Sequence, residues 1–141
     1  MKNLRTLITI CLLFTAVSMF AQTEGRLLVI SQIPFDFTVA DHIMPAGEYL
    51  IYTATPDRSI LISSADGKHH LFVNTLPNQT NAPSEKSSLM FQRYGSEYFL
   101  TQVWVANQQV VRSPFVSNRQ VQLARSGSKP EKTTVAALSG R

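Results

Sequence analysis

The chain of 141 residues carries 13 basic and 9 acidic residues, a formal charge of +4, and 44% of its residues are hydrophobic. This length fits a single domain and excludes most multi-domain enzymes. The charges are dispersed without a block of like sign, so we expect no nucleic-acid partner. The hydrophobic content suffices for an ordinary core, and we expect folding without a metal ion or a disulfide.

The start of the chain has the three features of a secretory signal peptide. Lys2 and Arg5 make it positive, 7–17 is an almost unbroken apolar run, and the small residue Ala21 suits a cleavage site. The run is shorter than the ~20 apolar residues of a membrane span. We therefore expect 1–21 to be a cleaved signal peptide, followed by a periplasmic or secreted protein without a stable membrane span.

The remaining chain divides into a β domain over 22–125 and a tail over 126–141. Cys11 is the single cysteine and lies in the signal, so the mature chain has no disulfide, thiolate metal site or Cys nucleophile. The tail opens with Ser, Gly, Lys and Pro, which is typical of a flexible extension, and 133–138 is a candidate edge strand. Within the β domain, 76–87 has the composition of a long exposed connection.

Alternating apolar residues predict strands along most of the β domain. Segment 26–33 is apolar on both alternating sets, as in a strand covered on both faces. Phe35 and Phe37 alternate with polar residues, which predicts one buried face, and a turn at 45–47 leads into a strand over 48–55. We predict an all-β, single-domain antiparallel β-sandwich or partly closed barrel of about seven strands, with one short C-terminal helix.

Two tight turns predict hairpins and their registers. Asp66-Gly67 and Gly95-Ser96 are residue pairs that suit two-residue β-turns. Each turn places apolar residues opposite apolar residues across its hairpin. The predicted partners are Ile60 with Val73, Leu61 with Phe72, Ile62 with Leu71, Phe91 with Leu100 and Arg93 with Tyr98. We further expect Trp104 on the same side of its strand as Leu100.

A short helix is predicted near the end of the β domain. Ser117 is followed three residues later by Gln120, which is the spacing of a capping box, and the helix should end near Gly127. A helix of this length is marginal in isolation. We therefore expect the side of the helix that carries Val121 and Ala124 to dock onto the sheet.

Patterns for catalysis and metal binding are weak. The histidines are His42, His69 and His70, and the last two are adjacent on a predicted strand, where they point to opposite faces. We therefore expect no metal site and no cofactor. The sequence also lacks a serine-hydrolase elbow and a phosphate-binding glycine-rich loop. The enzyme alternative is a small hydrolase or glycan-active protein that uses Asp36 or Glu48 with His42.

Aromatic residues are spread along the predicted strands, and most share faces with aliphatic residues, which favours core packing. As candidate surface recognition residues we single out Tyr94, Tyr98 and Trp104. Exposed Tyr and Trp rings stack on sugars or contact peptides. The sequence does not specify the partner, but an envelope protein or a glycan would suit such rings.

Three sequence blocks occur together in a fixed order: IPFDFTV at 33–39, MPAGEY at 44–49 and FQRYGSEYFLTQVW at 91–104. In this combination the chain resembles an uncharacterised family of small exported bacterial proteins, abundant in acidobacteria. The resemblance spans 27–125 and implies export and one β domain. It implies no activity, so it transfers no catalytic or ligand residue to this chain.

Together these features favour an exported, non-enzymatic β domain with a structural or binding role. Besides the hydrolase or glycan-active enzyme, a second alternative is a barrel that binds an apolar small molecule. Such a barrel would need an interior cavity lined by Phe35, Phe37 and Phe91.

Overall fold

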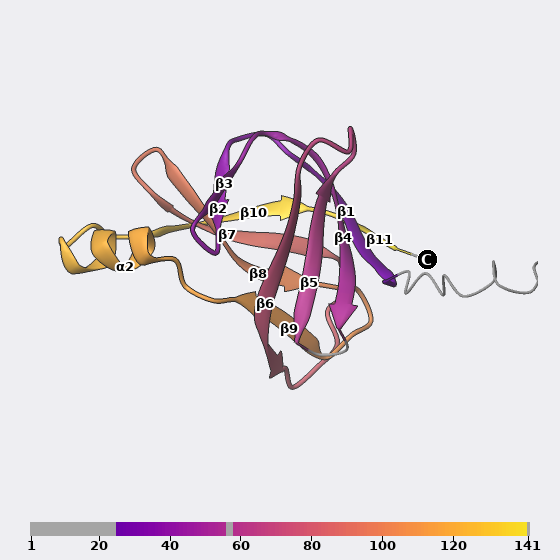
Figure 1. Cartoon of the computed structure of the whole chain (residues 1–141). Coiled ribbons are helices and arrows are strands. Elements are labelled where there is room, and N and C mark those ends of the chain that lie inside the picture. Colours follow the sequence, from indigo (N-terminus) through magenta and orange to yellow (C-terminus); the bar gives the residue numbers. More distant parts are fainter. Residues whose placement is uncertain (1–24, 56–57, 141) are drawn as a thin grey trace, which may run out of the picture.

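The computed structural model describes residues 25–55 and 58–140, and the predicted signal peptide lies outside these residues. The described chain forms strands and one short helix (Figure 1), which confirms the all-β class. The elements are β1 (Leu27–Ile33), β2 (Phe37–Val39), β3 (His42–Met44), β4 (Gly47–Thr55), β5 (Ser59–Ser64), β6 (His70–Gln79), β7 (Ser88–Tyr94), β8 (Glu97–Trp104), β9 (Val110–Pro114), α2 (Asn118–Arg125), β10 (Glu131–Ala136) and β11 (Leu138–Ser139). The described part of the chain holds no helix that is long and apolar enough to cross a membrane.

One sheet path connects most strands in the order β10-β7-β8-β9-β6-β5-β4-β1-β11. All neighbours on this path pair antiparallel, whereas β2 pairs antiparallel with β3 and parallel with β8. In Figure 1, β4, β5 and β6 cross in front of β7, β8 and β9. The described residues contain eleven strands where about seven were predicted, because 42–44, 110–114 and the tail add short strands.

The β5–β6 hairpin has the predicted register, with Leu61 opposite Phe72. Its loop is longer than the predicted two residues, because the last backbone hydrogen bond runs from Ser64 N to His69 O (2.9 Å). The Asp66 carboxylate accepts a hydrogen bond from Ser64 Oγ (2.5 Å). An acceptor on a turn side chain stabilises the wider loop without changing the register of the strands.

β6 continues to Gln79, into the segment whose composition indicated a loop. Its second half pairs with β9, with Leu76 opposite Ser113. The prediction of a connection was therefore wrong for 76–79. Pairing with a strand that is distant in sequence prevails over the turn-forming composition, because strand preference depends on tertiary context.

The β7–β8 hairpin has the predicted register at its tip, with Phe91 opposite Leu100. Thr101 is then an extra residue on β8, and it shifts the pairing by one position. Because of this bulge, Leu100 and Val103 both reach the core. Trp104 therefore lies on the opposite side from the one predicted.

Between β1 and β4 the chain forms a hairpin that the sequence did not indicate. Ala40 and Asp41 join β2 to β3 with φ angles of 47° and 67°. Two successive left-handed residues make a turn whose twist suits a hairpin, although side chains other than glycine disfavour it. Asp41 also accepts hydrogen bonds from Asn118 N (2.6 Å) and Nδ2 (3.1 Å), which tie the hairpin to the start of α2.

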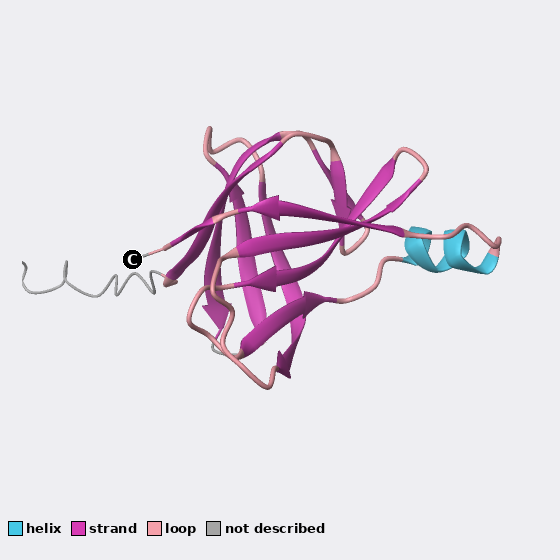
Figure 2. Cartoon of the chain, turned by 180° about the vertical axis from the view of Figure 1, so that it is seen from behind, coloured by secondary structure: helices cyan, strands magenta, loops and turns pink. Residues whose placement is uncertain are grey.

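The helix α2 begins after Ser117 as predicted, and Ser117 Oγ accepts a hydrogen bond from Gln120 N (3.1 Å). The expected apolar docking was wrong, because Ala124 is exposed and the buried residue of the helix is Gln120. The Gln120 side chain donates to Gln92 Oε1 on β7 (2.7 Å) instead of closing a capping box. The helix projects from the strands (Figure 2), so polar contacts near its start hold it in place.

Residues 126–140 of the tail form two paired strands, where we expected a flexible extension. β10 pairs with β7 and β11 pairs with β1, so the two ends of the sheet path follow one another in the chain. Ser31 Oγ on β1 donates to Ala136 O (2.8 Å), and Gly140 N donates to Leu28 O (2.7 Å). The tail thereby connects the first strand with the β7–β8 hairpin.

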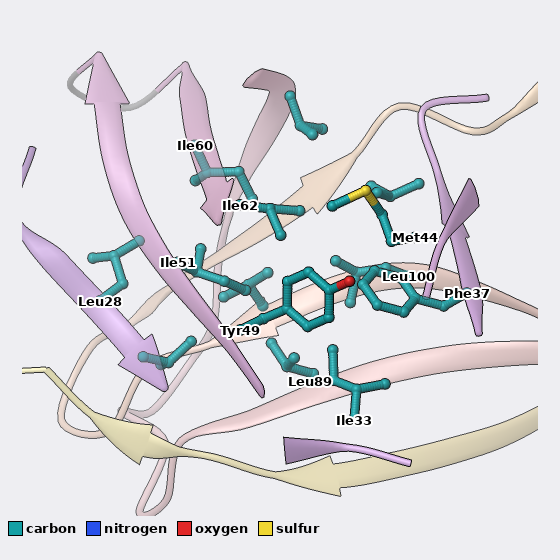
Figure 3. Close-up of a cluster of buried hydrophobic side chains, with 14 of the residues drawn as sticks. Leu28, Ile33, Phe37, Met44, Tyr49, Ile51, Ile60, Ile62, Leu89 and Leu100 are labelled. Carbon is teal, nitrogen blue, oxygen red and sulfur yellow. The ribbon is translucent and has the colours of Figure 1, made fainter. Parts of the chain in front are cut away.

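The core is a cluster of apolar side chains between strands β4 to β6 and the strands β7 to β9 that they cross. Figure 3 shows Tyr49 in the middle of this cluster. Phe37 packs edge-on against Tyr49 and Phe91, with ring centroids 5.2 and 5.6 Å apart. Phe35 packs edge-on against Phe91 at 5.0 Å. The rings that would line an interior cavity therefore contact one another.

Candidate ligand-binding face

The predicted recognition residues Tyr94, Tyr98 and Trp104 do not form one exposed surface. Tyr94 is 7% exposed and packs edge-on against Phe99, so the prediction of a surface ring was wrong there. Tyr98 is half-buried and stacks on Phe35, with centroids 3.7 Å apart. Trp104 is half-buried, and its indole N–H donates to a side chain of its own strand.

The three residues of the enzyme alternative do not meet in one hollow. Asp36 Oδ1 accepts a hydrogen bond from Ala46 N (2.9 Å) in the turn before β4. Asp36 and Glu48 line different hollows, of 110 and 190 Å³. His42 is exposed on β3 and lines neither of them.

The hollow of 190 Å³ contains Glu48, Asp66 and His69, and its polar groups organise the β5–β6 turn. Ser64 Oγ donates to Asp66 and accepts from the backbone N of His69 (3.0 Å). The hydrogen bond from Ser64, followed by one from the backbone of Lys68, lowers the pKa of the Asp66 carboxyl. An acid with a lowered pKa stays ionised, which suits a turn acceptor and not a general acid.

Tyr49 is the buried phenol beside this hollow. Burial raises its pKa, and the charges of Asp66 and Asp36 raise it further. Its hydroxyl donates to Pro45 O (2.6 Å). The phenol therefore remains a protonated donor that fastens the start of β4.

Both ring nitrogens of His70 are engaged. Nε2 lies 2.8 Å from Gly67 O, and Nδ1 lies 2.9 Å from Ser63 Oγ. A carbonyl only accepts, so Nε2 carries a proton and donates to Gly67 O. Among residues 25–55 and 58–140, no three His, Cys, Asp or Glu side chains are grouped to hold a metal ion.

Half-buried and exposed apolar side chains gather on the outer side of β4, β5 and β6. Tyr52, Leu61 and Phe72 lie directly opposite one another across these strands, and therefore on the same side of the sheet. Phe72 is 71% exposed. Together with Gly25, Thr53 and Ala54, these three residues line a hollow of 250 Å³.

A larger hollow of 570 Å³ lies further along β6. Its lining residues are Arg58, Asn74, Thr75, Leu76, Pro77 and Phe115. Leu76 and Phe115 are 53% and 50% exposed. Phe72 and Leu76 are four positions apart on one strand, so the two hollows share its outer side. We call Tyr52, Leu61, Phe72, Leu76 and Phe115 the outer apolar face.

Sequence reasoning missed this face, although the hairpin register contained its signal. The pair Leu61–Phe72 lies between two other apolar pairs of the same hairpin. Both sides of the hairpin are thus apolar, and in the structure only one of them faces the core. The part of the face around Leu76 was not predicted, because 76–87 was interpreted as a loop and not as part of a strand.

Comparison with protein-family models, with curated proteins and with solved structures finds no match to this chain. The resemblance to the exported family therefore stays a prediction. Function has to be inferred from the fold and from the outer apolar face.

Proposed function

We propose that the chain is an exported, non-enzymatic binding module that acts in the periplasm or outside the cell. The observation that carries this proposal is the outer apolar face, on which Phe72 is 71% exposed. Large apolar side chains that gather on one side of a domain are typical of a binding surface. A ligand or an envelope partner that covers these side chains removes their apolar area from water, which favours the complex.

For the fold, we favour a partly closed barrel over a sandwich. Only Ala137 separates β10 from β11, so one short segment pairs with β7 on one side and with β1 on the other. This arrangement supports closure around the core. A partly closed sheet of this kind would hold the strands of the outer apolar face in fixed positions.

Binding has more support than hydrolysis, because Asp36, Glu48 and His42 share neither hollow, and two of the acids stabilise turns. Asp36 holds the turn before β4, and Asp66 holds the β5–β6 turn. Binding of an apolar molecule inside the barrel also has less support than binding outside it. Phe35, Phe37 and Phe91 pack on one another there.

Binding of the uncharged dye N-phenyl-1-naphthylamine to the protein purified after export tests this proposal. We expect dye fluorescence to saturate, and Phe72→Ser to weaken binding about tenfold, since full burial of such a side chain is worth roughly 1.5–3 kcal/mol. Val116→Ser is the matched control, because Val116 is 63% exposed but lies outside the face. If Val116→Ser weakens binding as much as Phe72→Ser at unchanged thermal stability, the outer apolar face is not the binding surface.

A further inference from the structure

We propose that the hollow of 570 Å³ binds an amphiphile with one anionic head group, of the fatty-acid type. This inference rests on the proposed binding function and names a ligand class for one part of the outer apolar face. The volume lies within the range of about 300–1,000 Å³ of small-molecule sites. The ligand class follows from the walls of the hollow and from Arg58, the one charged residue among the described residues that line it.

The apolar walls of the hollow are Leu76, Pro77 and Phe115. The pairing of Thr75 with Pro114 positions Phe115 beside β6, where its backbone N lies 3.4 Å from Asn74 O. Leu76 and Phe115 each leave about half of their surface exposed. An alkyl chain placed between them would bury apolar surface against residues that paired strands already hold in position.

The charge of the hollow comes from Arg58. The Arg58 carbonyl accepts a hydrogen bond from Thr75 N (2.7 Å), which fixes its backbone beside β6. No acidic residue is among the described residues that line the hollow, and the guanidinium forms no ion pair with any of the described residues. A guanidinium at the rim of an apolar hollow favours a carboxylate, which it can bind through two parallel hydrogen bonds.

The hollow of 250 Å³ on the same face differs from this one in the charge of its lining. The described residues that line it include Tyr52, Leu61 and Phe72 but no charged residue. It therefore has apolar walls without a partner for an anion. A preference for anions should depend on Arg58 alone, whereas apolar contact is available in both hollows.

Titration of the protein with decanoate and with 1-decanol, both below aggregation, tests the inference. We expect decanoate to bind about three- to tenfold more tightly than the alcohol, as for a partly exposed charge-assisted contact. Arg58→Gln should remove this preference by weakening the binding of decanoate. Phe115→Ser should weaken the binding of both ligands. The control Arg125→Gln removes an exposed arginine of α2 that does not line the hollow, and it should retain the preference.

Equal affinity of the unmodified protein for the two ligands would overturn the inference. A loss of preference in Arg125→Gln as large as in Arg58→Gln would also overturn it, because net charge would then explain the effect. If Phe72→Ser abolishes dye binding while Arg58→Gln keeps the decanoate preference, the anion site is refuted and the binding module stands. If decanoate depends on Arg58 and Phe115 while Phe72→Ser binds dye normally, the hollow stands and the wider face is refuted.

Discussion

At the scale of single residues, a few side chains determine the conformation of the β5–β6 turn. Ser64 donates to the Asp66 carboxylate, and Gly67 N donates to Ser64 O (3.0 Å). Gly67 has a φ angle of +74°, and a Cβ atom there would find open space. The glycine is therefore needed for its backbone angle and not for close packing.

Replacement of this glycine isolates the backbone effect. We expect Gly67→Ala to lower the free energy of unfolding by about 1 kcal/mol, the cost of a left-handed L-residue. Gly67→Asn should cost less, since asparagine tolerates this conformation better. Urea unfolding of the two variants measures the difference. Equal losses in both would mean that side-chain crowding, and not the angle, limits this position.

Asp66 predicts a dependence of stability on pH. Its folded-state pKa is lowered below the ordinary value of 3.8, mainly by the Ser64 hydrogen bond. A lowered folded-state pKa stabilises the protein above the unfolded-state pKa, and this contribution is lost as pH falls through the folded-state pKa. The stability difference between the unmodified protein and Asp66→Asn should therefore be constant near neutrality and shrink below pH 3.8. Thermal unfolding at several pH values checks this, and a difference that stays constant in acid would contradict it.

At the scale of elements, α2 is held by polar contacts at its first turn. Ser117 caps the helix, Gln120 bonds to Gln92, and Arg119 forms two hydrogen bonds with Glu97 (3.1 and 3.0 Å). Arg119 and Glu97 are largely exposed, and exposed ion pairs contribute only about 0.2–1 kcal/mol. The cap and the buried amide pair should therefore contribute more than the ion pair.

Hydrogen exchange separates these contributions. We expect Ser117→Ala to weaken α2 by about 1 kcal/mol, the usual effect of losing such a cap, and to speed exchange of the Gln120 amide about fivefold. Arg119→Gln should change this exchange less. A larger effect of Arg119→Gln would show that the ion pair dominates the docking.

The elements that local patterns determine were predictable, and those that distant partners determine were not. The β5–β6 register, the β7–β8 register at its tip and the Ser117 cap follow from nearby residues, whereas the bulge at Thr101 was not predicted. The extension of β6 to Gln79 depends on β9, and the left-handed turn at Ala40 has no sequence signal. The recognition residues were misplaced for a similar reason, since alternation shows which residues share a side but not which side is covered.

At the scale of the whole molecule, one short segment forms both end strands of the sheet path, β10 and β11. Ser87 adds to this contact: its Oγ lies 2.6 Å from Ser139 Oγ and accepts from Ala106 N (2.9 Å). A Cβ atom on Gly140 would lie 2.2 Å from Leu27 O. This glycine is therefore required by close approach of the backbone.

Gly140→Ala should consequently detach β11 from β1. We expect a loss of about 1–3 kcal/mol in the free energy of unfolding, as for other overpacked sites, and faster exchange of the amides in β11. Leu138→Ser is the control, because that side chain is 72% exposed and its replacement leaves the backbone contact intact. If the alanine variant keeps the protection of β11, the close approach of Gly140 is not needed for the pairing.

The position of these last two strands also determines when folding is completed. Synthesis delivers the N-terminal residues first, so β1 and β7 lack one neighbour until 131–139 have emerged. A chain that is threaded through a narrow passage, as we propose for an exported protein, benefits from staying incomplete until its end arrives. For a chain exported as we propose, the late arrival of β10 and β11 would place the completion of the fold after translocation.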